Sequence, residues 1–312
     1  MTLVLGSLQL GLLYGLLAMG IYIAFRILNI PDLTAEGSFT FGLAVSAAFT
    51  VAGHPILGIF MSILAGALAG VVTGLLQTKS GIHPILAGIL TMSGLYSVNL
   101  SIMGSSSNLS LISNDNLFKM SYELLGWDKD ICKLVVSALA VILAAAVLIW
   151  FFKTHMGLCI RATGDNEEMV KASSINIHVT KLLALAIGNA SIALSGGLIA
   201  QYQGFADINS GVGILVVGLA SVIIGELFTR KKTVTVGFIS AIAGSVVYRF
   251  IVALAMSTSF FPAYALKLVS AVIVGVALAL PAIQEFHGER KNRKTQKADY
   301  LQARENRKKG EV

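Results

Sequence analysis

Charged residues are scarce in this chain. Asp, Glu, Lys and Arg make up 12% of its 312 residues, whereas hydrophobic residues make up 55%. A soluble domain carries roughly 25% charged residues, so the composition excludes an ordinary soluble domain and indicates an integral membrane protein. The apolar stretches are long enough to cross a bilayer as helices, and their lack of strict alternation favours helices over an outer-membrane barrel.

Cysteine and the common catalytic motifs are rare or absent. The two cysteines, Cys132 and Cys159, lie at opposite ends of one predicted span, so they cannot pair within the chain, and no CxxC spacing suits a metal. The sequence contains no GxxxxGK[ST] phosphate-binding loop, no HExxH and no GxSxG. We therefore expect no cofactor, no metal and no ATP hydrolysis by this chain, and the sequence disfavours a membrane-embedded enzyme.

The apolar stretches predict an all-α, polytopic transmembrane bundle of about nine spans. The count lies between eight and ten because the second span is short. Glycines at small-xxx-small spacing, such as Gly66, Gly70 and Gly74, predict close helix packing in lipid. The predicted spans cover residues 3–27, 37–51, 56–76, 85–103, 131–151, 182–202, 212–228, 234–256 and 265–281.

Lys and Arg fall in segments that share one predicted side of the membrane. The segment 161–176 has basic flanks, residues 230–232 are all basic, and the tail 286–312 carries much of the net charge of +7. These segments predict a cytoplasmic C-terminus and an external N-terminus. We divide the chain into a membrane-spanning domain, 1–285, and a basic tail, 286–312, whose charge suits membrane lipid rather than nucleic acid.

A faint internal repeat lies within the predicted bundle. PDLTAEGSFTFGLAVSAAF, from Pro31, is similar to ADINSGVGILVVGLASVII, from Ala206, if one gap is allowed. The two copies fall on opposite predicted sides, which is typical of inverted repeats in transporters. Chance similarity between Gly- and Ala-rich segments is the alternative.

The segment RATGDNEEMVKASSIN, residues 161–176, has helix signals of its own between two spans. Asp165 followed by Glu168 predicts a capping-box-like start, and Gly164 before it allows a sharp turn. Glu167 and Glu168 also lie near the positive end of the helix dipole. These signals fit a partner-docking helix and an ordinary interfacial connector equally well.

The same segment resembles the cytoplasmic signature of permease subunits of ABC importers in the branched-chain amino acid, ribose and nucleoside class. Residues 175–176 match the end of that signature, although Ser174 replaces its usual glycine. ILNIPDLTAEGSFTFG and HPILAGILTMSGLYSVNLSIMG also resemble segments of this class, the second in a subgroup implicated in amino-acid uptake, aromatic amino acids included. The R-A-x-G-x-N core of the signature is matched by Arg161, Ala162, Gly164 and Asn166.

The resemblance implies a multi-pass permease of a bacterial plasma membrane that carries a small solute, an amino acid, through a homodimer. It also implies two further partners, cytoplasmic ATP-binding subunits and an extracytoplasmic solute-binding protein. The loop 154–180 would then be the coupling loop that meets the ATPase. Its ATPase-coupling residues would be Arg161, Gly164, Asp165, Asn166, Glu167 and Glu168.

Charged and polar residues in or beside the spans are candidates for the translocation path. Arg249 lies deep in a predicted span, where contact with the solute and an internal pair, for instance with Glu226, are equally good accounts. Capping is the favoured account of the acidic candidates, and packing that of the tyrosine. The candidates are Arg249, Tyr248, Asp32, Glu36, Asp207 and Asn209.

An ion-coupled secondary transporter is the alternative function. It would explain the repeat and Arg249 without partners, and it predicts uptake by this chain alone. An ABC importer predicts no transport without an ATPase. The elaborated loop 161–176 favours the importer and argues against a purely structural subunit.

Overall fold

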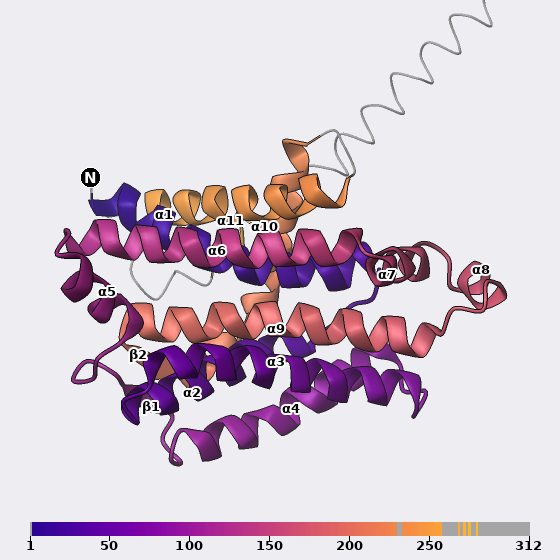
Figure 1. The fold of residues 1–312 in the computed structure, drawn as a ribbon, viewed down its shortest axis with the longest axis horizontal. Helices are drawn as coiled ribbons and strands as arrows, with labels where there is room; N and C mark the ends of the chain where they lie inside the picture. Colours follow the sequence, from indigo (N-terminus) through magenta and orange to yellow (C-terminus); the bar gives the residue numbers. More distant parts are fainter. Residues whose placement is uncertain are drawn as a thin grey trace, which may run out of the picture.

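The computed structural model of the chain describes residues 2–229 and 233–257, together with residues 268, 271–272, 274–275 and 279. These residues form a bundle of long helices, with two short strands at one end (Figure 1). In chain order the elements are α1 (Thr2–Tyr22), the π-turn η1 (Ile23–Ile27), α2 (Thr34–Val51), α3 (Pro55–Thr78), α4 (Pro84–Ile102), β1 (Asn108–Ser110), α5 (Leu117–Leu125), α6 (Lys129–Lys153), α7 (His155–Asp165), α8 (Glu167–Ala172), α9 (Ile177–Gln203), β2 (Phe205–Asp207), the 3₁₀ turn η2 (Ile208–Gly211), α10 (Ile214–Leu227) and α11 (Val234–Ser257).

The prediction of an all-α bundle is confirmed, because each of the first eight predicted spans coincides with a helix. Seven helices of the described part are long and apolar enough to cross a membrane. α2 is not among them, since its 18 residues include Glu36 and several Ser and Thr. The predicted span 265–281, apart from single residues, and the tail 286–312 lie outside the described residues.

Glycine permits the closest contacts between helices, as the spacing in the sequence predicts. A Cβ atom at Gly66 would overlap the backbone oxygen of Asn189, and one at Gly70 would overlap that of Leu185. The backbone of α3 therefore lies directly against α9, which with α1 is the most buried of the seven candidate spans of the described part. Such contact is a main source of helix association in lipid.

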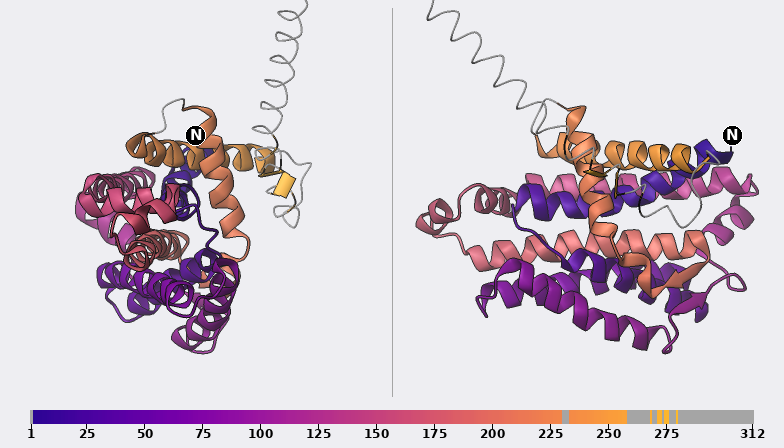
Figure 2. Two further views of the ribbon diagram at one scale, coloured as in Figure 1. Left: turned by 90° about the vertical axis from the view of Figure 1, so that its right-hand side faces the viewer. Right: turned by 180° about the vertical axis from the view of Figure 1, so that it is seen from behind.

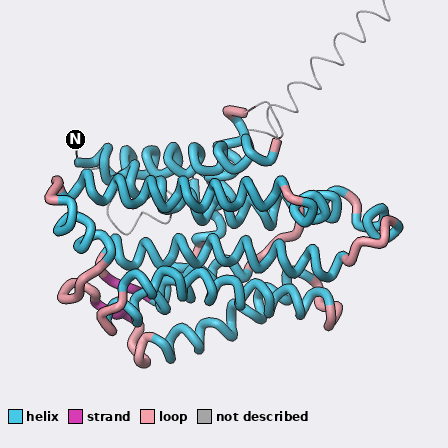
Figure 3. The backbone as a smooth tube through the Cα atoms, viewed as in Figure 1, coloured by secondary structure: helices cyan, strands magenta, loops and turns pink. Residues whose placement is uncertain are grey.

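The two ends of the bundle differ. The N-terminus, α5 and the antiparallel pair β1–β2 lie at one end, whereas α7 and α8 lie at the opposite end (Figures 1 and 3). In the strand pair, Leu109 is opposite Ala206. The relative placement of the N-terminus and the segment 161–176 on opposite ends agrees with the predicted topology.

Two helices begin inside the bundle rather than at its ends. After η1, residues 28–33 turn back into the bundle and α2 begins at Thr34 (Figure 2). From the other end, η2 leads into α10, which begins beside the start of α2 and crosses the bundle at a steep angle (Figure 2). These two segments are the two copies of the sequence repeat. The helix starts that they form pack together. An inverted symmetry between them stays a prediction.

Candidate functional site

The short helix α8 projects at the end of the bundle opposite the N-terminus (Figure 1). Its N-cap is Asn166, whose Oδ1 accepts a hydrogen bond from the backbone N–H of Met169 at 3.1 Å. The sequence prediction of Asp165 as the cap is wrong, because α7 continues through that residue and the helical backbone breaks one position later. An asparagine side chain caps as well as an aspartate, so sequence preference does not separate the two.

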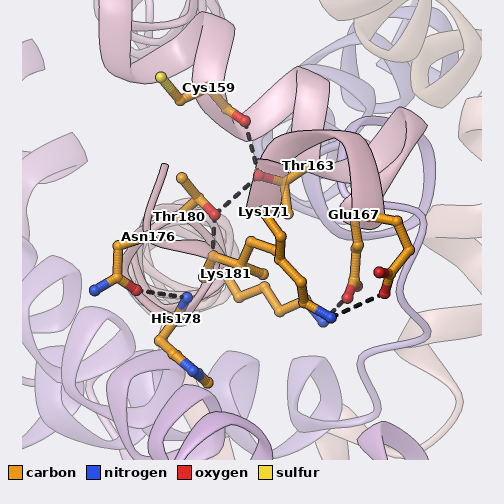
Figure 4. Close-up of polar contacts among 10 residues, drawn as sticks. Cys159, Thr163, Glu167, Lys171, Asn176, His178, Thr180 and Lys181 are labelled. Carbon is orange, nitrogen blue, oxygen red and sulfur yellow. Dashed lines mark hydrogen bonds and ion pairs between the residues drawn. The ribbon is translucent and has the colours of Figure 1, made fainter. Parts of the chain in front are cut away.

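Both acidic residues of the first turn of α8 form ion pairs. Lys171 donates a hydrogen bond to Glu168 at 2.9 Å, and this bond raises the pKa of Lys171. Glu167 pairs with Lys181 on α9 (Figure 4). Exposed pairs contribute about 0–1 kcal/mol, so the pair with Lys181 orients α8 against α9 more than it stabilises the fold.

α8 presents an exposed apolar side chain and a neighbouring cavity. Val170 is buried toward the bundle, whereas Met169 is 64% exposed. A cavity of about 490 Å³ lies beside α8 and is lined by residues 77–78, Glu167, Lys171, residues 174–178 and Lys181. The amide nitrogen and oxygen of Gln77 are buried there, without a hydrogen-bond partner among the described residues.

The turn after α8 shows why the related signature carries glycine where this chain has Ser174. The backbone of Ser174 has φ of +59°, in the left-handed region. A residue with a Cβ atom is strained there, whereas glycine adopts this region readily. The serine is therefore a tolerated departure that keeps the turn and adds local strain.

α7 packs tightly against the π-turn at the end of α1. A Cβ atom at Gly164 would overlap the backbone oxygen of Ile27, so glycine is required here for close contact rather than for the predicted turn. The hydroxyls of Thr163 and Thr180 lie 2.9 Å apart and join α7 to α9 (Figure 4). Arg161 is partly buried on the same helix. Motion of α7 would therefore be transmitted to the ends of α1 and α9.

Asp32 fixes the chain that returns into the bundle. It is 1% exposed, and its carboxylate accepts hydrogen bonds from the backbone N–H of Thr34 at 2.9 Å and from Asn189 Nδ2 at 2.7 Å. The first bond is the capping contact that the sequence favours for this residue. The second ties the start of α2 to the middle of α9.

Glu36 lies in the first turn of α2 and also caps α10. Its Oε1 accepts a hydrogen bond from the backbone N–H of Gly213 at 3.0 Å, and the carboxylate accepts a further one from the N–H of Leu215. A Cβ atom at Gly211 would overlap the backbone oxygen of Glu36 and the hydroxyl of Thr40. Glycine at 211 thus lets η2 approach α2 closely enough for this contact.

A pocket of about 380 Å³ opens beside Glu36, between α2, α4 and the η2 segment. Asn99, on α4, lines it and is 1% exposed, and its Oδ1 has no hydrogen-bond partner in the described part of the chain. Glu36 is the member of the predicted path set that lines this pocket. The lining residues are Glu36, Gly37, Thr40, Met92, Ser93, Tyr96, Asn99, Ile208, Gly211 and Val212.

Asp207 and Asn209 lie next to this pocket without being among its lining residues. Asp207 caps η2 by accepting a hydrogen bond from the backbone N–H of Asn209 at 2.8 Å, as capping predicts. Asn209 itself is exposed. Their neighbours Ile208 and Gly211 reach the pocket, so the cap shapes its wall.

Arg249 and Tyr248 lie on α11, away from the pocket. The guanidinium carbon of Arg249 lies 3.5 Å from the ring centre of Tyr14 on α1. Glu226, considered as its partner, pairs instead with Arg26. Tyr248 is 1% exposed, as packing predicts. Within the described residues, the Nε atom of Arg249 and the hydroxyl of Tyr248 have no hydrogen-bond partner.

Residues 3–280 match the family model described as the permease component of the branched-chain amino acid transport system. The chain belongs to this permease family. A curated relative, the tyrosine transport system permease protein of Clostridioides difficile, strain R20291, is 40% identical over 269 residues, which are 86% of this permease and 88% of the relative.

Two further similarities are more distant. The LsrC permease protein of the autoinducer 2 import system of Yersinia enterocolitica is 26% identical over 78% of the permease and 64% of that protein. The solved structure of PsaBC from Streptococcus pneumoniae in complex with Fab is similar over 88% of the permease and 89% of that chain, with a TM-score of 0.49 and 17% identity.

Family membership separates the two transport functions left open by the sequence. The permease is a multi-pass membrane component of an ABC importer and not a secondary transporter. Its two candidate regions are built from different elements: one from α7 and α8, and the pocket beside Glu36 from α2, α4 and the η2 segment.

Sequence reasoning did not identify several residues that line the pocket or contact the predicted path residues in the permease. Asn99 and Asn189 are uncharged and lie within apolar spans, where only a rule for intramembrane amides would have marked them. Tyr14 resembles any aromatic core residue until Arg249 is placed over it. Glu36 was identifiable by charge, but its contact with Gly213 spans 177 positions, and no local pattern encodes it.

Proposed function

We propose that the permease imports an amino acid through a path formed by two copies of this chain. Cytoplasmic ATP-binding subunits dock at α7–α8, and an extracytoplasmic solute-binding protein delivers the solute at the opposite end. ATP hydrolysis takes place on the separate subunits. The relative from Clostridioides difficile, whose name assigns it to tyrosine transport, supports an amino acid as the solute.

The pocket beside Glu36 supports the translocation path. Its volume of about 380 Å³ lies in the range of small-molecule sites. Tyr96 and Val212, which line it, are 52% and 61% exposed, so the pocket opens on the surface of the single copy. A carboxylate facing lipid is costly, so this opening suits a water-filled path between two copies better than a lipid contact.

The remaining path candidates have supporting parts in this proposal. Asp32 holds the start of α2, and Asp207 and Asn209 hold η2 in place beside the pocket. Arg249 lies at the contact between α1 and α11, and in this proposal its guanidinium faces the path or the second copy, whereas Tyr248 is buried in the packing behind it.

The projecting, capped helix α8 is the observation that carries ATPase coupling. It extends beyond the bundle with Met169 exposed, its first turn is tied to α9 through Glu167, and α7 contacts the end of α1 through Gly164. A docking helix of this kind needs both an exposed face and a stiff link to the spans. The proposed coupling residues are Arg161, Gly164, Asp165, Asn166, Glu167 and Glu168.

This assignment also fixes the orientation that we propose. The α7–α8 end faces the cytoplasm of a bacterial cell and the N-terminus faces outward, with residues 1–285 as the permease domain and the basic tail 286–312 at the cytoplasmic lipid surface. The basic flanks of the coupling loop and the basic tail agree with this orientation.

Cross-linking tests the coupling proposal. A cysteine at Glu168 is expected to cross-link to cysteines placed in a groove of the ATP-binding subunit, and a matched cysteine at Glu123, on α5 at the opposite end, is not. The native Cys132 and Cys159 are buried, so their background is low. Labelling of Glu168→Cys by an impermeant thiol reagent added outside intact cells would contradict the orientation.

Uptake tests the importer itself. Proteoliposomes that contain the permease, its ATP-binding subunits and the binding protein are expected to accumulate amino acid only with ATP inside the compartment that α8 faces. The purified permease alone is expected to bind no nucleotide, because its sequence has no phosphate-binding loop. ATP-independent, ion-driven uptake by the permease alone would overturn the proposal.

A further inference from the structure

We propose that the pocket beside Glu36 binds the ammonium group of the transported solute, with the Glu36 carboxylate and Asn99 Oδ1 as its acceptors. This inference rests on the proposed function, because it assigns the solute-recognition chemistry of the same path. It makes Glu36 and Asn99 residues that determine specificity for solutes with a primary amine.

The side-chain oxygen of Asn99 is a buried hydrogen-bond acceptor without a donor among the described residues. Its Nδ2 lies 3.5 Å from the backbone oxygen of Gly37, and because that oxygen can only accept, the contact directs the other amide atom, Oδ1, away from it. Asn99 is 1% exposed, and its Oδ1 has no partner among the described residues. A buried acceptor without a partner is unfavourable, and an N–H donor from a solute would remove that cost.

Glu36 supplies the negative charge. Its hydrogen bonds from the N–H groups of Gly213 and Leu215 hold the carboxylate in place at the pocket wall. An ionised carboxylate has about four lone-pair positions, so two bonds leave room for an ammonium donor. Thr40 also lines the pocket. Its hydroxyl hydrogen is already donated to the backbone oxygen of Glu36, at 3.1 Å, so toward a solute the hydroxyl oxygen can only accept.

An anion is a poor fit for this pocket. A helix start such as that of α10 usually attracts anions, but there the carboxylate of Glu36 already accepts hydrogen bonds from the N–H groups of Gly213 and Leu215. None of the described residues that line the pocket is Lys, Arg or His. A buried acceptor beside a held carboxylate therefore selects a cation with hydrogen-bond donors.

The rest of the pocket suits an organic side chain rather than a bare ion. Met92, Ile208 and Val212 give an apolar wall, and Tyr96 adds an aromatic ring with a polar tip. Small-solute sites typically combine such walls with a few placed polar groups. A structural role for Glu36 alone, as the cap of α10, would leave the free acceptor of Asn99 without a reason.

Protection of a pocket cysteine tests the proposal directly. Ser93 lines the pocket and is exposed, so Ser93→Cys in the importer complex, held in lipid nanodiscs, can be labelled with a maleimide. The probes are L-phenylalanine, phenethylamine, which keeps only the ammonium, and 3-phenylpropionate, which keeps only the carboxylate. The first two are expected to slow labelling at millimolar concentration, and 3-phenylpropionate is not.

Substitutions then connect the protection to the two acceptors. Glu36→Gln keeps an oxygen for the Gly213 N–H but loses the charge, and Asn99→Leu removes the acceptor; each is expected to weaken protection by phenethylamine about tenfold or more. Glu123→Gln, at an exposed carboxylate of α5, is the matched control with unchanged protection. Thermal unfolding of each variant checks that the fold persists.

The outcomes separate this inference from the proposed function. Equal protection by all three probes, protection by none, or unchanged protection in either Glu36→Gln or Asn99→Leu overturns the ammonium site even if the importer takes up amino acids. Conversely, an importer that takes up no amino acid refutes the proposed function, whatever the probes do. The ammonium site is supported only if protection follows the amine and depends on both acceptors.

Discussion

Glu226, near the end of α10, pairs with Arg26 in the π-turn that ends α1. The two side chains come from positions 200 residues apart, and both are partly exposed. α10 begins at the pocket, where Glu36 caps it, and it ends at this ion pair. The helix is thus held at one end by the start of α2 and at the other by the end of α1.

Charge reversal tests whether this pair holds α10 in place. Arg26→Glu and Glu226→Arg each place like charges together and are expected to lower the thermal stability of the solubilised permease and its uptake rate. The double variant restores the pair, with a coupling free energy of about 0.2–1 kcal/mol for partly exposed groups. Reversing Lys119 and Asp115, an exposed pair on the α5 side, is the control with no effect on uptake. A double variant no better than the single ones would contradict the pairing.

Gly164 is expected to be sensitive even to the smallest side chain. In Gly164→Ala the new Cβ meets the backbone oxygen of Ile27, so α7 must move away from the π-turn. Overpacking of this kind costs about 1–3 kcal/mol. Because the chain after Ile27 leads through Asp32 to Glu36, we expect ATP hydrolysis and uptake to become uncoupled while the ATP-binding subunits stay bound. Measuring solute imported per ATP hydrolysed checks this, and an unchanged ratio would show that the contact carries no coupling.

We expect the side chain of Asn166, and not that of Asp165, to stabilise the start of α8. Asn166→Ala removes the acceptor of the Met169 N–H and should destabilise α8 by about 1 kcal/mol. Asp165→Ala is the matched control, since that residue ends α7 and makes no cap bond to α8. The free energy of unfolding, measured for both variants, should fall by this amount for the first alone. The opposite order would restore the assignment made from sequence.

The sequence predicted what depends on local pattern. Hydropathy located α1 and α9, glycine spacing predicted close helix packing at Gly66 and Gly70 but not its partner, and polarity located α8. It could not predict that Asn166 rather than Asp165 caps α8, because Asp and Asn cap equally well. Nor could it predict the pocket, since α2 and the start of α10 meet only through contacts between distant parts of the chain, such as that of Glu36 with Gly213, 177 positions apart.

Ser174 offers a stabilising substitution. Its φ of +59° strains a residue with a Cβ atom by about 1–2 kcal/mol. Glycine at this position would relieve the strain, but its greater flexibility in the unfolded chain offsets part of that stabilisation. We therefore expect Ser174→Gly to raise the free energy of unfolding by about 0.5–1 kcal/mol. Ser173→Gly is the matched control. Ser173 has φ of −85°, which any residue adopts without strain, so glycine there should only lower the free energy of unfolding. Thermal unfolding of the two variants should shift in opposite directions; equal shifts would contradict the assignment of strain to residue 174.

The stacking of Arg249 on Tyr14 predicts a role that depends on the planar guanidinium. Arg249→Lys keeps the charge but loses the flat surface over the ring, and Tyr14→Leu removes the ring, whereas Tyr14→Phe keeps its face. The contact is worth about 0.5–2 kcal/mol, so a double-mutant cycle between Arg249→Lys and Tyr14→Leu should show coupling of that size in thermal stability.

Uptake by Arg249→Leu separates a structural contact from a part of the path. An arginine within a span costs about 2.5–3.5 kcal/mol on insertion, so the leucine variant should insert at least as well as the native chain. If the guanidinium faces the path or the second copy, as we propose, uptake by the assembled importer is lost although the ATP-binding subunits remain bound. Arg26→Leu, at the ion pair with Glu226, is the comparison that changes a cation at the end of α1 instead. Normal uptake by Arg249→Leu would remove this residue from the path and leave it as a packing partner of Tyr14 alone.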